Sequence, residues 1–163
     1  MKPYYIAFAR ADRLELLLKL FKKITIPEAV YREVVERGKD KPGAEVISQA
    51  EWIKVESVRE KDKVTSVPRQ LASGEAEAII LAEELGAVLL VDDLRARIEA
   101  KKRGLNLSSS IDILLEAKMQ GLIQSVKQML DELIATGFRL SDVLYHRVLH
   151  EAGEIDEGKF SVS

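Results

Sequence analysis

Hydrophobic and polar positions along the first half of the chain predict helices that alternate with short strands. We expect, in order, a helix over 6–21, a strand over 24–26 that leads into a helix, a helix over 43–51, a strand over 52–55 and a polar loop over 56–69. Pro27 suits the first position of the second helix, where its missing N–H is not needed, and Gly38 suits its end.

The second half has the clearer pattern. We expect a helix over 73–86, a strand over 87–91, a helix over 94–103, a short strand over 105–107, and helices over 111–120, 124–136 and 142–152. Ser73 is the expected N-cap and Gly86 the expected stop of the helix over 73–86. The unbroken apolar run AVLLV is typical of a strand covered on both faces. Strands alternating with helices predict an α/β fold with a mainly parallel sheet.

Composition narrows the class of protein. The chain has 163 residues, which predicts one domain over 1–153 followed by an acidic tail over 154–163. A formal charge of −2 gives no global electrostatic case for nucleic acid, so only a local basic patch would support one. Cysteine is absent, which excludes disulfides and thiolate zinc sites. No apolar run reaches the length of a membrane span and no signal-peptide pattern opens the chain, so we expect a cytoplasmic protein; the single asparagine hints at a thermophile.

Acidic residues from three segments are expected at one edge of the sheet. Asp92 and Asp93 directly follow the strand over 87–91, and Glu75 lies in the first turn of the helix before it. Because that helix runs antiparallel to the strand, its start and the strand's end lie at the same edge. The helix over 111–120 also starts at that edge, and Asp112 lies near its start. Clustered carboxylates without His or Cys point to magnesium or manganese, which would activate water for attack on a phosphate.

The helix over 94–103 supplies the opposite charge. Its basic residues, set against the single acid Glu99, are Arg95, Arg97, Lys101, Lys102 and Arg103. That patch could hold a phosphate backbone, although such a face is more often only solvated. The acids have alternative explanations as well: Glu75 suits the helix dipole, one of the two aspartates is expected to cap the helix over 94–103, and Asp112 alone is weak.

Together these motifs resemble the PIN-like nucleases, in a prokaryotic branch of uncharacterised PIN-domain proteins. The resemblance rests on GEAEAIILAEELGAVLLVDDLRARIEAKKRGLNLSSSIDILLEAKMQGLI, and further on IAFARADRLELLLKLF, IPEAVYREV and LDELIATGFRLSDVLYHRVLHEAGE. It implies a three-layer α/β/α sandwich with a central parallel sheet, and cleavage of RNA with magnesium or manganese. Many such proteins are toxins in the manner of VapC, each with a small antitoxin as its partner; a homodimer is also expected.

Site residues carry over by position. The resemblance implies that Glu75 and Asp93 are catalytic metal ligands, with Asp92 as a neighbour and Asp112 as an extra ligand. It also implies that Arg97 and the hydroxyl turn containing Ser108 and Ser110 contact RNA.

One departure from the family concerns the start of the chain. The family normally opens with a central strand that ends in an aspartate, whereas here Met1 or Lys2 stands at that position. Either the native N-terminus lies upstream, or this is a degenerate member. If the 163 residues are the whole protein, we expect weak or no cleavage.

Three hypotheses follow. The leading one is a metal-dependent ribonuclease, and the second is an inactive module that binds RNA or an antitoxin. A receiver-like signalling domain ranks third, because WIKV and LNL supply no aspartate at the end of another strand.

Overall fold

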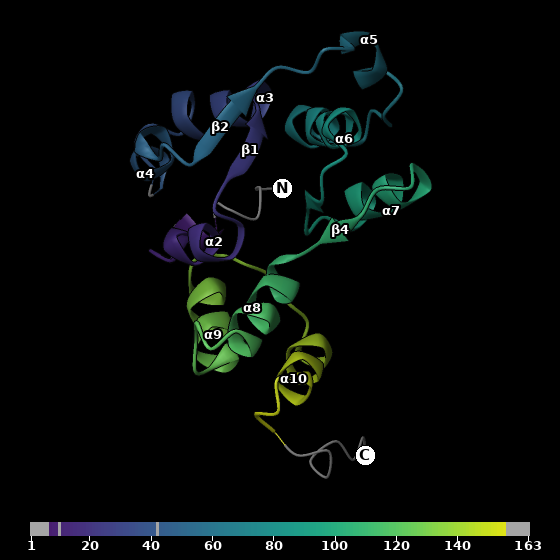
Figure 1. Ribbon diagram of the computed structural model, residues 1–163. Helices are drawn as coiled ribbons and strands as arrows, with labels where there is room; N and C mark the ends of the chain where they lie inside the picture. Colours follow the sequence, from purple (N-terminus) through teal and green to yellow (C-terminus); the bar gives the residue numbers. More distant parts are fainter. Residues whose placement is uncertain (1–6, 10, 42, 156–163) are drawn as a thin grey trace. The chain divides into compact units, whose positions relative to one another are not determined.

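The computed structural model of the protein describes residues 7–9, 11–41 and 43–155 (Figure 1). Met1 and Lys2, which stand at the position of the family's first aspartate, lie outside this range, as do residues 156–163 of the predicted tail. The chain divides into two compact units, Met1–Ser110 and Ile111–Ser163.

Helices outnumber strands among the described residues. In chain order the elements are α2 (Leu14–Phe21), β1 (Ile24–Pro27), α3 (Glu28–Tyr31), the π-helical turn η1 (Arg32–Glu36), α4 (Ala44–Gln49), β2 (Ile53–Glu56), α5 (Lys61–Val64), α6 (Ser73–Leu85), β3 (Leu89–Leu90), α7 (Leu94–Lys102), β4 (Leu107–Ser108), α8 (Ser110–Met119), α9 (Val126–Ala135) and α10 (Asp142–Glu151). The protein is thus a mixed α/β structure, as its sequence pattern predicted.

The strands form two small parallel sheets in the first unit. Strand β1 pairs with β2, with Ile24 opposite Ile53, and β3 pairs with β4, with Leu89 opposite Leu107. The expectation of parallel pairing is confirmed. In the described part of the chain, however, the two pairs do not join into the single central sheet that we expected.

Helix α6 is the centre of the first unit. It contacts both β1 and β3, and it also contacts α3, α5 and α7. Its residues Ile79, Ile80 and Leu81 are buried on successive faces because these neighbours surround it. The helix ends at Gly86, whose φ of 59° is a left-handed conformation that glycine adopts without strain. Since α6 packs on both strand pairs, it holds them in one unit.

Several local predictions need correction. The helix expected over 6–21 is interrupted near Asp12, which has a positive φ of 56°, and α2 begins only at Leu14. Pro27 is the last residue of β1, and α3 starts one residue later, at Glu28. Ala72 takes the N-cap position that we expected for Ser73. The loop expected over 56–69 contains the short helix α5.

The second unit is helical in the part that the structure describes. Its buried side chains come from α8, α9 and α10, and include Leu114, Leu130 and Leu149. Glu154, which we assigned to the acidic tail, instead accepts hydrogen bonds from the backbone N–H groups of Val126 and Lys127 and pairs with a lysine of α8. Across both units, none of the helices described combines the length and apolar character needed to cross a bilayer.

Candidate functional site

The two adjacent aspartates after β3 have different contacts. Both oxygens of Asp92 accept hydrogen bonds from Ser110: Oδ1 from its backbone N–H at 2.8 Å and Oδ2 from its hydroxyl at 2.5 Å. Asp93 caps α7, because its Oδ1 accepts from the Ala96 N–H at 2.9 Å. This confirms that one of the two aspartates is a cap. Asp92 therefore ties the end of β3 to the start of α8, whereas Asp93 keeps Oδ2 for other contacts.

Glu75 lies in the first turn of α6, as its position in the sequence predicted. Its Oε2 accepts a hydrogen bond from the Ala72 N–H at 3.3 Å, so the carboxylate also satisfies a backbone donor at the helix start. Burial raises the pKa of Glu75 above its ordinary value, and the negative charge of Asp93 raises it further. Glu75 and Asp93 border the same cavity, which agrees with repulsion between the two carboxylates.

Glu33 is an acid that the sequence analysis did not select. It lies in η1, and its charge is a further cause of the raised pKa of Glu75. A Cβ atom on Gly74 would lie 3.2 Å from the Glu33 Oε2 and 3.0 Å from Val30 Cγ2. The glycine before Glu75 therefore lets η1 approach the start of α6. Glu33 lies within the motif IPEAVYREV, but nothing in the spacing of that motif distinguishes it from the neighbouring acids Glu28 and Glu36.

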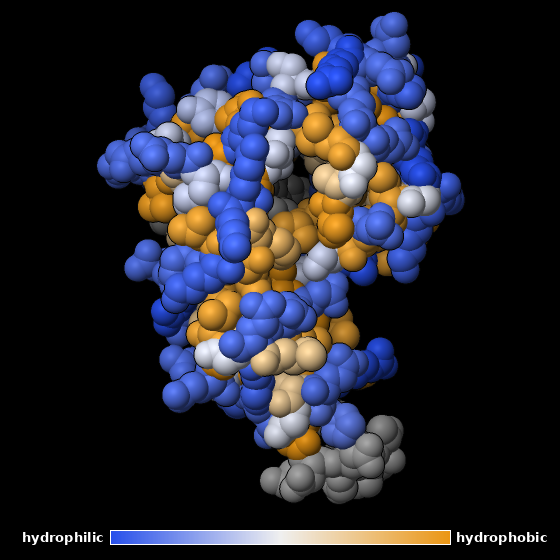
Figure 2. Space-filling view, viewed as in Figure 1, coloured by the Kyte–Doolittle hydropathy of each residue, from blue (hydrophilic) through white to orange (hydrophobic). Residues whose placement is uncertain are grey.

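These acids line one cavity of about 340 Å³ in the first unit. Glu33, Glu75, Asp92 and Asp93 all border it, together with apolar residues of β1, α6 and β3. Figure 2 shows hydrophobic residues gathered around a hollow in this unit. Glu75 and the two aspartates thus share one cavity, and their role as a site stays a prediction.

The donor atoms of this cavity are carboxylate oxygens, which are the ligands preferred by magnesium and manganese. Too few of these carboxylates lie close enough together to hold a metal ion. Over residues 7–9, 11–41 and 43–155, no group of three His, Cys, Asp or Glu side chains could hold a metal ion. The residue types fit a divalent cation, but the described carboxylates do not make a complete site.

Helix α7, which begins directly after Asp93 of the cavity, carries several basic side chains. Arg95, Lys101 and Lys102 are exposed. Arg97 is half-buried, and its guanidinium donates to the Val91 carbonyl at 3.0 Å. It thus holds the end of β3 against α7, while the three exposed cations lie on the surface.

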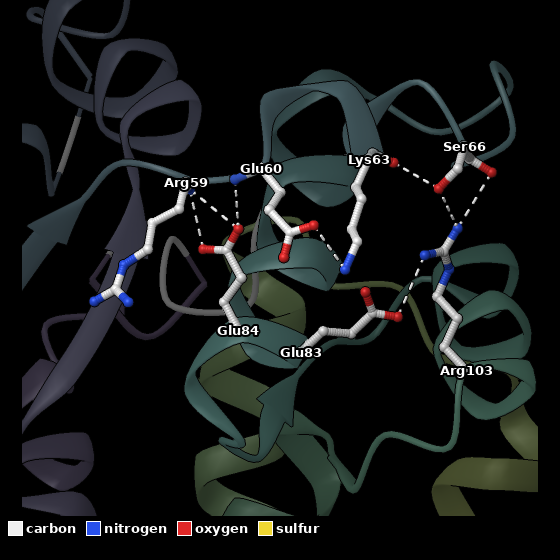
Figure 3. Close-up of polar contacts among 7 residues, drawn as sticks. All are labelled: Arg59, Glu60, Lys63, Ser66, Glu83, Glu84 and Arg103. Atoms are coloured by element: carbon white, nitrogen blue, oxygen red, sulfur yellow. Dashed lines mark hydrogen bonds and ion pairs between the residues drawn. The ribbon is translucent and has the colours of Figure 1, made fainter.

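Arg103 has contacts unlike those of the other basic residues. Its side chain is 17% exposed, and it forms ion pairs with Glu99 at 2.8 Å and Glu83 at 3.3 Å. It also donates to the carbonyl and hydroxyl of Ser66 (Figure 3). Beside it, Glu84 accepts from the N–H groups that precede α5. These contacts fasten the segment around α5 to α6 and α7.

The hydroxyl turn and Asp112 complete the predicted residues. Ser108 is half-buried in β4, and Ser110 is fully buried against Asp92. The Ser110 hydroxyl donates to Asp92, so it has a structural contact here, and its contact with RNA stays a prediction. Asp112 lies in the first turn of α8, in the second unit, and its role as a metal ligand stays a prediction.

Comparison with known proteins identifies a protein family. A protein-family model described as a PIN domain matches residues 4–154. The matched range contains all four acids of the cavity and parts of both compact units. Searches of curated proteins and of solved structures found no match.

Proposed function

Because the chain belongs to the PIN domain family, we propose that it is a metal-dependent ribonuclease that hydrolyses phosphodiester bonds of RNA. Its fold is then the three-layer α/β/α sandwich of that family. The observation that carries the proposal is the gathering of Glu33, Glu75 and Asp93 from three segments around one cavity. Like charges held together in a half-buried place favour a bound cation over bare carboxylates.

Glu75 and Asp93 are the proposed metal ligands, and Glu33 joins them. Magnesium or manganese, when bound, supplies an activated water and stabilises the charge on the phosphate. Asp92 is a positioning residue in this proposal, because both its oxygens bond to Ser110. Asp112 remains a further candidate ligand.

The exposed cations of α7 are the proposed contacts to the RNA backbone. Arg95, Lys101 and Lys102 are proposed for this role because their side chains are exposed. Each contact of such a cation with a phosphate releases a counterion and so favours binding. Arg97 and Ser108 lie closer to the protein interior and belong to the proposal as positioning groups near the strand ends. We leave Arg103 and Ser110 out of it, since protein partners occupy both side chains.

Cleavage of an end-labelled single-stranded RNA with manganese tests the proposal. We expect Glu75→Gln and Asp93→Asn each to reduce the rate at least about tenfold, as loss of metal-site groups commonly does. Glu36→Gln is the matched control, because Glu36 is exposed on the helical segment of Glu33 and does not line the cavity. Robust cleavage that survives both site substitutions would refute the assignment.

A second candidate function is supported by the incomplete metal site. A PIN domain in which no three described acids can hold a metal could bind RNA or a small antitoxin without turnover. Calorimetry with manganese separates the two, because an inactive binding module takes up no cation at Glu75. A role as the toxin of a toxin–antitoxin pair, and a homodimer, belong to the same proposal; growth arrest on expression that requires Glu75 tests the toxin role.

A further inference from the structure

Helix α7 has one side that is exposed to solvent. This surface, which we call the α7 face, consists of the exposed residues of the helix, Leu94, Arg95, Ile98, Lys101 and Lys102. Because an α-helix has about 3.6 residues per turn, these positions fall within about one third of its circumference. Ala96 and Ala100 lie on the other side, where they are fully buried in the same hydrophobic cluster as Ile79 of α6. The α7 face is therefore the side of the helix that points away from the core.

The large apolar side chains of α7 lie on this outer face. Leu94 is 69% exposed and Ile98 is 47% exposed, whereas the fully buried residues of the helix, Ala96 and Ala100, are small. A surface helix normally has the reverse arrangement, with its large aliphatic residues toward the core. Since Leu94 and Ile98 are four residues apart, their side chains are neighbours on the helix surface. Adjacent exposed aliphatic groups that polar residues border are typical of a protein-binding surface.

Three cations border this apolar pair. Around the circumference of the helix, Lys101 lies on one side of the pair, and Arg95 and Lys102 lie on the other. The single acid of α7, Glu99, lies outside the α7 face; its side chain is only 14% exposed and pairs with Arg103 at 2.8 Å. The five residues of the α7 face thus carry three positive charges and no negative charge. Such a surface attracts acidic groups.

The composition of the α7 face favours an acidic polypeptide over the other ligands that cations attract. A phosphate backbone would match the three cations, but it has no apolar group to cover Leu94 and Ile98. A second copy of the chain docked through the same face would place cations against cations, which opposes association. Two aliphatic side chains offer a membrane little apolar area. An amphipathic helix with leucines on one face and carboxylates at its borders matches both the apolar pair and the cations.

We propose that the α7 face docks an acidic amphipathic helix of a partner protein. Apolar residues of that helix cover Leu94 and Ile98, and its carboxylates pair with the three cations. This docking rests on the α7 face alone and involves no metal site. The same three cations are the proposed contacts to RNA, so the partner helix and RNA exclude each other. That consequence rests on the proposed function.

A labelled synthetic peptide, Glu-Leu-Glu-Ala-Leu-Leu-Glu-Glu-Leu-Leu-Ala-Glu-Leu-Glu, tests the docking to the full chain by fluorescence polarisation. As a helix it has its leucines on one face and glutamates at both borders of that face. We expect saturable binding to the wild-type chain. Binding should weaken at least about tenfold when glutamine replaces every glutamate, and likewise when alanine replaces every leucine. Equal binding of either control peptide would overturn the proposal.

Substitutions in the chain locate the binding to the α7 face. The double variant Leu94→Ser with Ile98→Ser should weaken peptide binding at least about tenfold, because the apolar contact is lost. The double variant Met119→Ser with Val143→Ser is the matched control. These two residues are 82% and 67% exposed, on α8 and α10, so the control also removes two exposed apolar side chains. Peptide binding that falls equally in both double variants would overturn the assignment to α7.

Binding of a labelled single-stranded RNA separates the two ligands of α7. Lys101→Glu should weaken binding of the peptide at least about tenfold and of RNA at least about threefold, because both contact cations. Lys39→Glu is the charge control, since Lys39 is exposed in the turn after η1. The double variant of Leu94 and Ile98 should change RNA binding by less than about twofold, because phosphates contact only the cations. An equal loss of peptide and RNA in that variant would make RNA the occupant of the whole face and overturn the proposal.

Other outcomes assign the α7 face differently or separate this inference from the nuclease. A dimer that the double variant of Leu94 and Ile98 dissociates would make a second copy the occupant and overturn the proposal. Phosphatidylserine vesicles that displace the peptide, or a free peptide of residues 156–163 that does so, would overturn it in favour of a membrane or of the chain's own C-terminus. If the peptide binds as expected but RNA is neither bound nor cleaved, the docking stands and the nuclease proposal fails.

Discussion

Replacing Asp92 should destabilise the fold far more than replacing Asp93, although the two residues are adjacent in the sequence. Asp92 accepts two hydrogen bonds from Ser110, whose side chain is fully buried. Asp93 accepts one described hydrogen bond, from the Ala96 N–H at the start of α7. The two substitutions therefore remove different numbers of bonds at different depths.

The size of the difference follows from these bonds. A hydrogen bond to a charged group contributes about 1.5–3 kcal/mol, so loss of both in Asp92→Ala should lower the free energy of unfolding by about 3–6 kcal/mol. Asp92→Asn should lower it by only about 1–2 kcal/mol, because the amide oxygen still accepts from the Ser110 N–H and the amide N–H₂ can donate to its hydroxyl. Asp93→Ala removes an N-cap, which is worth about 1 kcal/mol.

Urea unfolding, followed by circular dichroism, measures the three variants against the wild-type chain. Coincident transitions at two wavelengths check that a single free energy describes the unfolding. In the double variant with Ser110→Ala, the effect of Asp92→Ala should shrink by the share of one bond, because the hydroxyl donor is already gone whereas the backbone N–H of residue 110 remains. The reasoning fails if Asp92→Ala destabilises by less than about 1 kcal/mol, or if Asp93→Ala has the larger effect.

Other predictions concern charged groups. The pKa of Glu75 is raised by burial and then by the charge of Asp93, so ionisation of Glu75 opposes folding. Glu75→Gln should therefore raise the melting temperature at neutral pH. This gain should vanish as the pH falls through 4.5, the ordinary pKa of the carboxyl, because the wild-type carboxylate is then protonated. Glu154 is the opposite case. Burial would raise its pKa, but hydrogen bonds from Lys127 and its other donors lower the pKa below the ordinary value. Glu154→Gln should therefore lower the stability of the fold above about pH 4.5 and have a smaller effect at lower pH, where the carboxylate is protonated. Arg103→Met should lower the urea midpoint, because two ion pairs are lost in a partly buried place, whereas Arg95→Met should leave the midpoint unchanged and reduce RNA binding.

The sequence predicted the order and kind of most elements, for reasons visible in particular segments. The apolar periodicity and Gly86 located α6 to within one residue at its C-terminal end, because a left-handed glycine ends the helix there. Strand β3 was predicted over 87–91 but spans only Leu89–Leu90. An apolar run shows that a segment is suited to burial, but pairing depends on neighbours far away in the chain. The described neighbour, β4, lies on one edge only.

Site residues were predictable where local sequence determines their place. Glu75 and Asp93 occupy a helix start and a strand end, and these positions fix the edge of the sheet at which they lie. Glu33 could not be selected in the same way. Its place at the cavity depends on the approach of η1 to Gly74, a tertiary contact that no local pattern encodes. The burial of Ser110 against Asp92 likewise depends on a contact between distant segments, which the SSS motif alone does not encode.

The acids around the cavity separate into two kinds by how each affects stability. Asp92 has both its oxygens matched by donors of Ser110, and these hydrogen bonds stabilise the fold. Glu75 is half-buried with Asp93 and Glu33 as like-charged neighbours, so its ionised form opposes the fold. A purely structural carboxylate has no reason to occupy such a place, because glutamine would cap α6 equally well. Residues that lower stability in this way are typical of functional sites, where the repulsion is relieved by a ligand. The opposite signs expected for Asp92→Asn and Glu75→Gln therefore distinguish the group that holds the fold together from the one that awaits a cation.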